Sequence, residues 1–382
     1  MTLPRLAVIC DLLEEDWPSM DLVADMLLQR LAVANPRVFE AVRVRPSFAR
    51  RFTRLPVPSA RKRVAFNADR LLNRLWDYPR HLRHQRGRFE FHHVCDHTYA
   101  NVVHTLPRGR TGVFCHDLDT FRSILEPAVE PRPGWFRAMA WQILKGLQKA
   151  DVVFHTTATV RAQIVRYGLV DERRLVQAPY GISREFTPDA PEREAEPCLQ
   201  ALPPSFAHAR FLLHVGSCIP RKRLDVALEV FEGVRRDHPE LRFVQVGGEW
   251  SAAQSALISR LGMRDAIVQL PRQDHRTIAS FYRQAAVVMM PSEAEGFGLP
   301  VVEALACGSP VIASDIPVFR EVGGDAVVYA PLADVAEWAI AVGRALAGSE
   351  PDVADRAARL RHAARFSWKT HADTIAAAYA RL

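Results

Sequence analysis

The chain has 382 residues, of which 48% are hydrophobic and 24% are charged. This is the composition of a globular protein, and it argues against a disordered tail or a membrane-embedded chain. Because single hydrophobic cores rarely grow beyond about 250 residues, the length favours two domains. No run of about 18 uncharged apolar residues and no signal-peptide core is found, so we expect a cytoplasmic protein without a transmembrane helix.

The net charge of +7 is unevenly distributed. The segment from Arg43 to Arg88 contains fourteen Arg or Lys and only two acidic residues, so the rest of the chain is net negative. Within this segment, apolar residues recur with helical spacing between arginines, namely Val64, Ala68, Leu71, Leu72, Leu75 and Trp76. This pattern is typical of a basic amphipathic helix on an anionic membrane surface. A helix that packs its apolar stripe on its own domain fits the pattern equally well.

Short apolar runs alternate with longer amphipathic stretches along the whole chain, which predicts two α/β domains with doubly wound parallel sheets. In the first half, strands are expected at residues 6–10, 39–44, 91–94, 112–115 and 152–156, and helices include residues 21–31 and 136–149. In the second half, strands are expected at residues 211–215, 243–246, 267–270, 287–290, 311–314 and 326–329.

The domain boundaries are expected around one irregular segment. Residues 184–206 are rich in proline and show no apolar periodicity, which indicates a linker between an N-terminal domain over residues 1–183 and a C-terminal domain over residues 207–365. Ligands of open parallel sheets bind beyond the carboxyl ends of the strands. We therefore expect functional residues directly after strands, in a cleft between the two domains.

The most informative segment, residues 291–310, reads P-S-E-A-E-G-F-G-L-P-V-V-E-A-L-A-C-G-S-P and follows a predicted strand. Gly296 and Gly298 permit a tight backbone path, and Pro300 suits the first turn of a helix that Gly308 ends. A glycine loop that opens onto a helix N-terminus offers free N–H groups and the positive end of the helix dipole. The pattern predicts a site for a phosphate or diphosphate.

Two glutamates flank this site, Glu295 in the loop and Glu303 in the helix. Carboxylates accept hydrogen bonds from sugar hydroxyls, so the pair is expected to hold a hexose and a ribose on either side of a diphosphate. For Glu303, the role of a helix-start acid that complements the dipole fits equally well.

A second cluster reads G-S-C-I-P-R-K-R-L-D and follows the strand predicted at 211–215. Gly216 permits a close turn, and Arg221 and Lys222 supply two cations that can neutralise a diphosphate leaving group. A solvated basic turn is the commoner meaning of R-K-R. The donor role is favoured because both clusters follow strands of one predicted domain.

Together, G-x-x-x-x-R-K at residues 216–222 and E-G-F-G-L-P-x-x-E at residues 295–303 resemble the donor site of family 4 glycosyltransferases, which are retaining enzymes with the two-domain GT-B fold. The resemblance extends over nearly the whole chain, because H-D at 116–117, P-Y-G-I at 179–182 and F-S-W at 366–368 also match. It implies that a final helix within residues 366–382 returns to the N-terminal domain.

The resemblance also implies roles by position. Arg221 and Lys222 would bind the diphosphate of a nucleotide sugar, and Glu303 would hold its ribose. The transferred sugar would be held by Glu295 and by the backbone of the residues after it, Gly296, Phe297, Gly298 and Leu299.

His116 matches the histidine that faces the sugar and is important for catalysis in this family, and Asp117 follows it. An acid at a strand end is also commonly a turn residue. Asp117 and Asp119 form a D-x-D pattern, which is weak support for a metal-dependent enzyme. Because cations and a helix N-terminus can stabilise the departing diphosphate, we expect neither a metal nor a bound cofactor. The six cysteines form no C-x-x-C pair, so no zinc site is expected.

The family often carries a glycine-rich loop after its first strand, whereas this chain has D-L-L-E-E-D-W-P at residues 11–18. Asp16 could bind acceptor hydroxyls there and Trp17 could stack on a sugar ring. An exposed acidic loop with Trp17 as a packing anchor fits equally well.

These observations predict a hexosyltransferase that uses a nucleotide diphosphate sugar, and the resemblance implies that it retains the anomeric configuration. Its acceptor is expected to be a saccharide or lipid-linked molecule of cell-surface polysaccharide or glycolipid biosynthesis, and peripheral contact with the inner membrane face through residues 43–88 is left open. The alternatives are a nucleotide-sugar epimerase, a nicotinamide oxidoreductase, and a non-catalytic basic protein that binds membranes or nucleic acid. No G-x-G-x-x-G follows a strand, and no nucleic-acid-binding module is recognisable.

Overall fold

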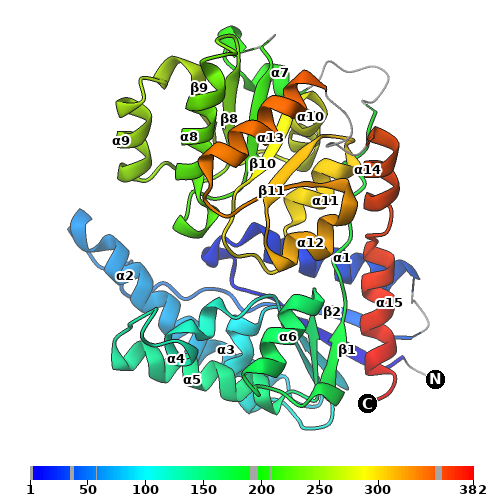
Figure 1. Ribbon diagram of the computed structural model, residues 1–382. Helices are drawn as coiled ribbons and strands as arrows, with labels where there is room; N and C mark the ends of the chain where they lie inside the picture. Colours follow the sequence, from blue (N-terminus) through cyan, green and yellow to red (C-terminus); the bar gives the residue numbers. More distant parts are fainter. Residues whose placement is uncertain (1–2, 35–37, 57, 190–196, 207–208, 349–354) are drawn as a thin grey trace. The chain divides into compact units, whose positions relative to one another are not determined.

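The computed structural model describes residues 3–34, 38–56, 58–189, 197–206, 209–348 and 355–382. The chain divides into two compact α/β units (Figure 1). The N-terminal unit consists of Met1–Tyr180 and Trp368–Leu382, and the C-terminal unit consists of Gly181–Ser367.

The N-terminal unit is built on a parallel sheet of six strands in the order β2-β1-β3-β4-β5-β6. The strands are β1 (Arg5–Ile9), β2 (Glu40–Val44), β3 (Phe91–Val94), β4 (Thr111–Cys115), β5 (Val152–His155) and β6 (Leu175–Gln177). The central strands are buried along nearly their whole length, which explains why they appear in the sequence as continuous apolar runs.

Helices cover both faces of this sheet. The α-helices are α1 (Pro18–Ala34), α2 (Ser59–Leu72), α3 (Tyr78–His84), α4 (Arg122–Leu125), α5 (Gly134–Lys149), α6 (Ala158–Arg166) and α15 (Trp368–Tyr379). Shorter helical segments are η1 (Leu13–Glu15), the π-helical η2 (Asn73–Asp77), η3 (His97–Thr105), η4 (Asp119–Phe121) and η5 (Glu172–Arg174). On one face, residues of α3, η3 and α5 form a core with side chains from β1, β3, β4 and β5.

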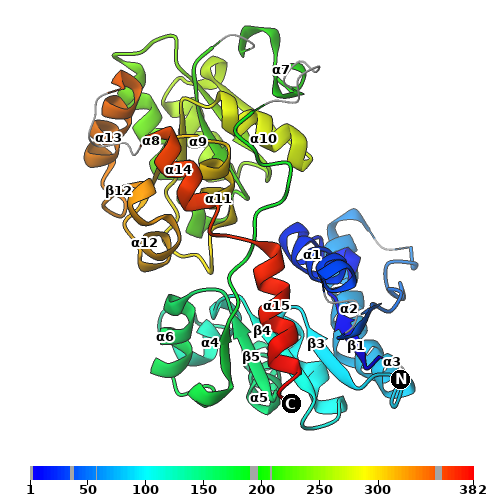
Figure 2. The same ribbon diagram turned by 90° about the vertical axis from the view of Figure 1, so that its right-hand side faces the viewer.

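The final helix, α15, packs beside α1 as part of the N-terminal unit (Figure 2). The Tyr379 hydroxyl donates to the carbonyl of His92 at 2.9 Å and lies 3.1 Å from Nδ1 of His93. Gly112 of β4 leaves room for that hydroxyl, because a Cβ at this position would lie 2.3 Å from it. The predicted return of the last helix to the N-terminal domain is therefore confirmed.

The C-terminal unit has a second six-stranded parallel sheet, in the order β12-β11-β10-β7-β8-β9. Its strands are β7 (Phe211–Val215), β8 (Arg242–Val246), β9 (Ile267–Leu270), β10 (Val287–Met290), β11 (Val311–Ser314) and β12 (Val328–Ala330). Its helices are α7 (Pro197–Ala201), α8 (Leu224–Arg235), α9 (Ala252–Arg260), α10 (His275–Gln284), α11 (Leu299–Ala306), α12 (Pro317–Gly323), α13 (Val335–Ala347) and α14 (Arg356–Ala363). Short 3-10 turns are η6 (Pro204–Phe206), η7 (Pro220–Lys222), η8 (Arg264–Ala266) and η9 (Gly324–Ala326).

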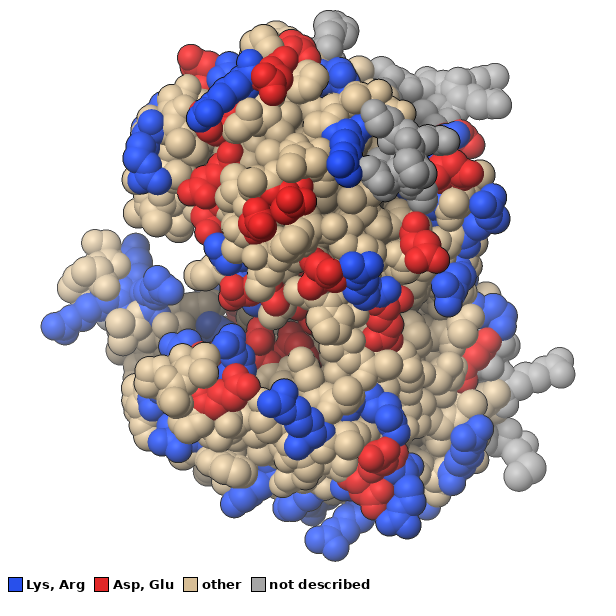
Figure 3. Space-filling model, viewed as in Figure 1, with Lys and Arg blue, Asp and Glu red and all other residues tan. Residues whose placement is uncertain are grey.

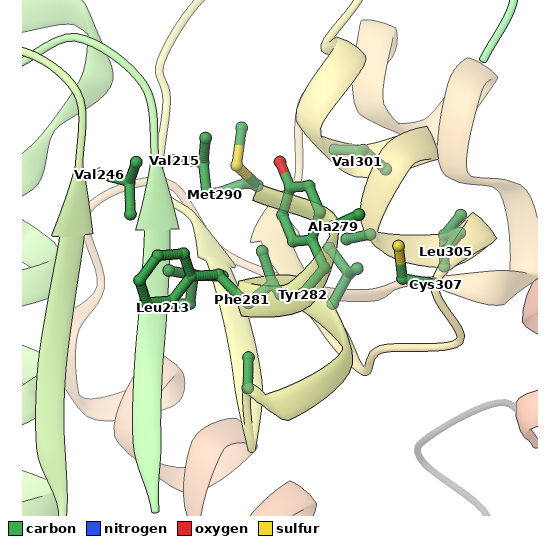
Figure 4. Close-up of a cluster of buried hydrophobic side chains, with 14 of the residues drawn as sticks. Leu213, Val215, Val246, Ala279, Phe281, Tyr282, Met290, Val301, Leu305 and Cys307 are labelled. Carbon is green, nitrogen blue, oxygen red and sulfur yellow. The ribbon is translucent and has the colours of Figure 1, made fainter. Parts of the chain in front are cut away.

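Alternate side chains of these strands fill two cores, one on each face of the sheet. On one face, Leu213 and Met290 pack with Phe281 and Tyr282 of α10 and with Leu305 of α11 (Figure 4). The opposite core, beneath α8, α9 and α13, is formed by the intervening strand residues and includes the fully buried Trp338. The loops that follow β7 and β10 therefore start from rigid, neighbouring strands.

Three local predictions differ from the structure. The strand β6 was not predicted, and the strand expected at 326–329 is β12, at Val328–Ala330. The described parts of the predicted linker, residues 184–206, belong to the C-terminal unit, because Phe186, Cys198 and Phe206 are buried in its core. Isolated apolar residues of this kind produce no periodic signal, although each is buried.

Among the helices that the structure describes, none has the length and apolar character needed to cross a bilayer. All six cysteines are free thiols with buried side chains. The described residues contain no group of three or more His, Cys, Asp or Glu side chains arranged to hold a metal ion.

Candidate functional site

The glycine-rich loop of the C-terminal unit joins β10 to α11. Gly298 precedes the first residue of α11 with φ of +88°, and a Cβ there would lie 2.7 Å from the ring of Phe319. Pro300 lies in the first turn, as predicted, and the helix begins at Leu299, one residue before the predicted first position at Pro300. The Phe297 side chain is buried and packs edge-on against Phe366, so only its backbone is available to a ligand.

The structure brings together three of the predicted donor residues, Arg221, Lys222 and Glu295. Lys222 Nζ lies 2.5 Å from Glu295 Oε1, and Arg221 Nη1 lies 3.8 Å from Glu295 Oε2. The Glu295 side chain is only 7% exposed. Burial by itself raises the pKa of Glu295, but the charges of Lys222 and Arg221 and a hydrogen bond from Lys222 outweigh it and leave the pKa lowered. The cluster therefore carries two cations against one ionised carboxylate.

Backbone contacts fix this cluster in place. Arg221 donates from Nη1 to the carbonyl of Ala294 at 3.0 Å, and the Glu293 N–H donates to the carbonyl of Arg221 at 2.9 Å. These bonds tie the loop after β7 to the loop after β10, and the two strands are neighbours in the sheet. The charged groups are thus positioned before any ligand arrives, which is the condition for electrostatic stabilisation of a developing charge.

Two buried polar residues support Gly216, and sequence reasoning did not single them out. Gln245 donates from Nε2 to the carbonyls of Gly216 and Gly247, both at 2.7 Å, and its Oε1 lies 2.7 Å from His214 Nδ1. Burial, together with the charge of Lys222, lowers the pKa of His214 to about 4. The signal that could have found them is a polar residue inside each of two apolar strands, F-L-L-H-V and F-V-Q-V.

Glu303 lies in α11, and it is not part of the first turn, so the helix-start role is not supported. It accepts a hydrogen bond from the Tyr282 hydroxyl at 3.3 Å and is 8% exposed. Burial raises its pKa to about 7, and the bond from Tyr282 offsets only part of that effect. Near neutral pH this carboxyl therefore exists in both protonation states.

In the N-terminal unit, His116 follows β4 and both of its ring nitrogens have partners. Nε2 lies 2.7 Å from the carbonyl of Cys95, and Nδ1 is hydrogen-bonded to the Tyr180 hydroxyl. Because a carbonyl only accepts, Nε2 carries the proton and Nδ1 accepts from Tyr180. Burial lowers the pKa of His116, so the ring is held neutral and in one tautomer.

Asp117 takes the turn role that sequence reasoning had left open. Its Oδ1 accepts from the Asp119 N–H at 3.0 Å and lies 3.7 Å from Nε2 of His97. The same histidine lies 3.3 Å from Asp96 through Nδ1. His97 was not predicted, although it occurs in D-H-T directly after a strand, which is where a functional polar pair is expected.

A buried acidic pair, also missed, follows the neighbouring strands β1 and β3. Neither carboxylate oxygen of Asp11 has a hydrogen-bond partner among the described residues, whereas Asp96 accepts from the N–H and hydroxyl of Thr98 at 2.8 and 2.6 Å. Burial and the charge of Asp96 raise the pKa of Asp11 well above its usual range. Burial thus favours the protonated form of Asp11, whereas the hydrogen bonds from Thr98 favour the ionised form of Asp96.

The acidic loop after β1 divides into buried and exposed parts. Glu15 is buried, forms an ion pair with Arg70 and accepts from the Tyr99 hydroxyl at 3.2 Å. Asp16 has φ of +52° and is exposed, and Trp17 is 53% exposed. The Trp17 side chain is therefore partly accessible, as the stacking role requires.

Comparison with known proteins identifies the family of one domain. Residues 203–365 match the family described as glycosyl transferases group 1. The chain carries a group 1 glycosyltransferase domain. This match covers the transferase domain that holds Arg221, Lys222, Glu295 and Glu303.

Curated relatives of this chain include two proteins named D-inositol 3-phosphate glycosyltransferase. The one from Mycolicibacterium smegmatis is 29% identical over 307 residues, which are 74% of this chain and 68% of that protein. The one from Segniliparus rotundus is 30% identical over 243 residues, 60% of this chain. The matched stretch spans about half, 52%, of the length of this second relative.

Solved structures show the shared fold. Sucrose-phosphate synthase from Thermosynechococcus elongatus superposes with a TM-score of 0.72 at 20% identity, covering 99% of this chain and 98% of the other. Anabaena Alr3699/HepE, solved in complex with UDP and glucose, has a TM-score of 0.73 at 14% identity over 99% of this chain and 100% of its own. The predicted two-domain GT-B fold is confirmed, and the match over residues 203–365 agrees with the predicted glycosyltransferase group.

Proposed function

We propose that this glycosyltransferase moves a hexosyl group from a nucleotide diphosphate sugar to a saccharide or lipid-linked acceptor, with retention of anomeric configuration and without a metal ion. The observation that carries the proposal is the cluster of Arg221, Lys222 and Glu295 at the ends of two neighbouring strands. The family match favours this reaction over an epimerase, an oxidoreductase or a nucleic-acid-binding protein. A role in cell-surface polysaccharide or glycolipid synthesis rests on family analogy.

In this proposal the ion pair between Lys222 and Glu295 is rearranged when the donor binds. The diphosphate takes Lys222 and Arg221 as its cationic partners, with the N-terminus of α11 close by in sequence. Glu295 then keeps its negative charge and accepts hydrogen bonds from hydroxyls of the transferred sugar. Glu303 accepts from the ribose in its ionised form.

Transfer breaks the bond between the anomeric carbon and the diphosphate oxygen and forms a bond to the acceptor oxygen. The cations stabilise the negative charge that develops on the diphosphate. We expect the acceptor hydroxyl to attack on the face that the diphosphate leaves, and its proton to pass to the departing diphosphate. His116 is not assigned as the base, because Nδ1 already accepts a hydrogen bond and burial lowers its pKa.

As the family resemblance implies, we propose that His116 and Asp117 of the N-terminal unit contribute to catalysis, with Tyr180 and Cys95 as positioning groups for the imidazole. Asp16 and Trp17 are proposed to bind the acceptor. The exposed indole of Trp17 supports stacking on a pyranose ring.

The test is a panel of nucleotide sugars, measured by thermal shift and by release of nucleoside diphosphate, with and without EDTA. One donor should stabilise the protein and be hydrolysed slowly, and EDTA should make no difference. Lys222→Ala and Glu295→Gln should each lower that hydrolysis at least a hundredfold, since each removes a charge-assisted contact. Glu293→Ala, in the same loop with an exposed side chain, serves as the matched control. Wild-type hydrolysis by Glu295→Gln would reject the donor site.

A further inference from the structure

The side of α2 and η2 that is buried against the rest of the N-terminal unit is largely polar and is not the apolar side. The buried residues on this segment are Ala65, Asp69 and Asn73, which recur every four positions and so lie on one side of the helix. Two of the three are polar. The apolar residues of the segment lie mainly on other sides.

Hydrogen bonds explain this orientation, because the buried polar residues hold the preceding loop. Asp69 accepts from the N–H groups of Arg51, Phe52 and Thr53 at 2.9, 2.9 and 3.0 Å and from the Thr53 hydroxyl at 2.7 Å. Burial alone would raise the pKa of Asp69, but these bonds lower it to about 2. Asn73 bonds to both the N–H and the carbonyl of Ala49, at 2.7 and 2.9 Å.

The apolar residues of α2 and η2 are left facing solvent. Val64 is 67% exposed and Trp76 is 63% exposed, and Leu72 and Leu75 are also exposed. The loop that Asp69 holds adds Phe52 and Leu55, both exposed. We refer to these six apolar residues, together with the basic residues Arg61, Lys62 and Arg63, as the α2 surface.

The basic residues of the α2 surface are largely free of acidic partners. Arg61, Lys62 and Arg63 are exposed and form no ion pair with any residue that the structure describes. By contrast, Arg70 is paired with Glu15. Figure 1 shows α2 extending away from the other elements of its unit, and Figure 3 shows Lys and Arg atoms gathered on the projecting end.

We propose that the α2 surface docks on the anionic headgroups of a phospholipid bilayer, with its apolar side chains inserted between them. Charge complementarity identifies the partner, because one continuous helical segment carries both unpaired cations and exposed Val, Leu and Trp side chains, which match a surface that is anionic outside and apolar just below. Nucleic acid would use the cations but not the aliphatic side chains. The inference concerns binding alone and does not depend on the transferase activity.

Flotation of the full chain with lipid vesicles tests this proposal. The protein should float with vesicles of phosphatidylcholine and phosphatidylglycerol, and not with phosphatidylcholine alone. Leu75→Ser with Trp76→Ser should lower the fraction bound at least tenfold, and so should Arg61→Glu with Arg63→Glu. The salt dependence should be strong, because the exposed charges are screened at high ionic strength.

The matched control replaces two exposed tryptophans elsewhere in the same unit. Trp135 and Trp141 of α5 are 62% and 45% exposed, so Trp135→Ser with Trp141→Ser removes comparable apolar area and should leave flotation unchanged. Circular dichroism melting identifies any variant that fails to fold. Wild-type flotation by the Leu75→Ser, Trp76→Ser variant would overturn the proposal. A dimer or protein complex that depends on Trp76, with no vesicle binding, would overturn it as well.

Discussion

Glu303 links the donor site to the stability of the C-terminal unit. Its pKa in the folded protein is raised to about 7 by burial, above the usual value of 4.5. A raised acid pKa favours the folded state fully below pH 4.5, and this contribution is lost as the pH rises through 7. The loss corresponds to about 3 kcal/mol of unfolding free energy.

We therefore predict that Glu303→Gln stabilises the C-terminal unit at pH 8.5 and has little effect at pH 4.5, because glutamine cannot ionise. Urea denaturation at the two pH values measures this difference. The conservative variant Tyr282→Phe, which removes only the bond to the carboxyl, provides the comparison. Equal destabilisation by Glu303→Gln at both pH values would contradict a buried, titrating carboxyl.

Donor affinity should depend on the same proton. If the ribose binds the ionised form of Glu303, the binding-competent fraction falls about tenfold between pH 8 and pH 6. We expect the dissociation constant of the donor to rise by about that factor, measured by isothermal titration calorimetry. In Glu303→Gln, binding should be weaker and should lose this dependence. A donor affinity that is flat in the wild type would remove Glu303 from the ribose site.

Among the strands, helices and loops, the sequence predicts those whose pattern lies within a few consecutive residues. Buried parallel strands are continuous apolar runs, and the loops after β7 and β10 carry their glycines and charges within a few positions, so both were found. The short strand β6 and the isolated core residues of segment 184–206 have no comparable local pattern. Amphipathic spacing predicted the helix α2 but not which side is buried, because that depends on bonds from Asp69 to residues 16 to 18 positions away. Tyr180 lies 64 positions from His116 in the sequence, so their hydrogen bond likewise cannot be predicted from a local pattern.

The loop that precedes α2 should depend on Asp69. Asp69→Ala removes the acceptor of four hydrogen bonds, so the amides of Arg51, Phe52 and Thr53 should exchange hydrogen at least tenfold faster, and the unit should lose about 2 kcal/mol of stability. Hydrogen–deuterium exchange measures the first effect. Asp77→Ala, which removes an exposed ion pair with Arg51, should change exchange only slightly. Similar exchange in both variants would show that Asp69 does not hold the loop.

For the whole molecule, the two units differ in the groups that titrate between pH 4 and 7. In the N-terminal unit, burial lowers the pKa of His92 and His371 to about 4 and of His93 to about 3. These residues are neutral when folded and take up protons near pH 6.5 when unfolded, so their contribution to stability is lost as the pH falls below 6.5. The lowered pKa of His116 adds to this effect and the raised pKa of Asp11 opposes it, so these two contributions largely offset each other.

In the C-terminal unit, the two effects largely cancel, because acidification weakens the contribution of His214 and strengthens that of Glu303. We therefore predict that the N-terminal unit loses protection first when the pH is lowered from 7 to 5. With about three protons taken up on unfolding, its stability should fall by roughly 4 kcal/mol per pH unit near pH 5. Hydrogen exchange of the full chain, followed by peptide, measures both units in one sample, with the C-terminal unit as internal control. Earlier loss of protection in the C-terminal unit would mean that carboxylate pairs, and not the buried histidines, set the acid stability of this protein.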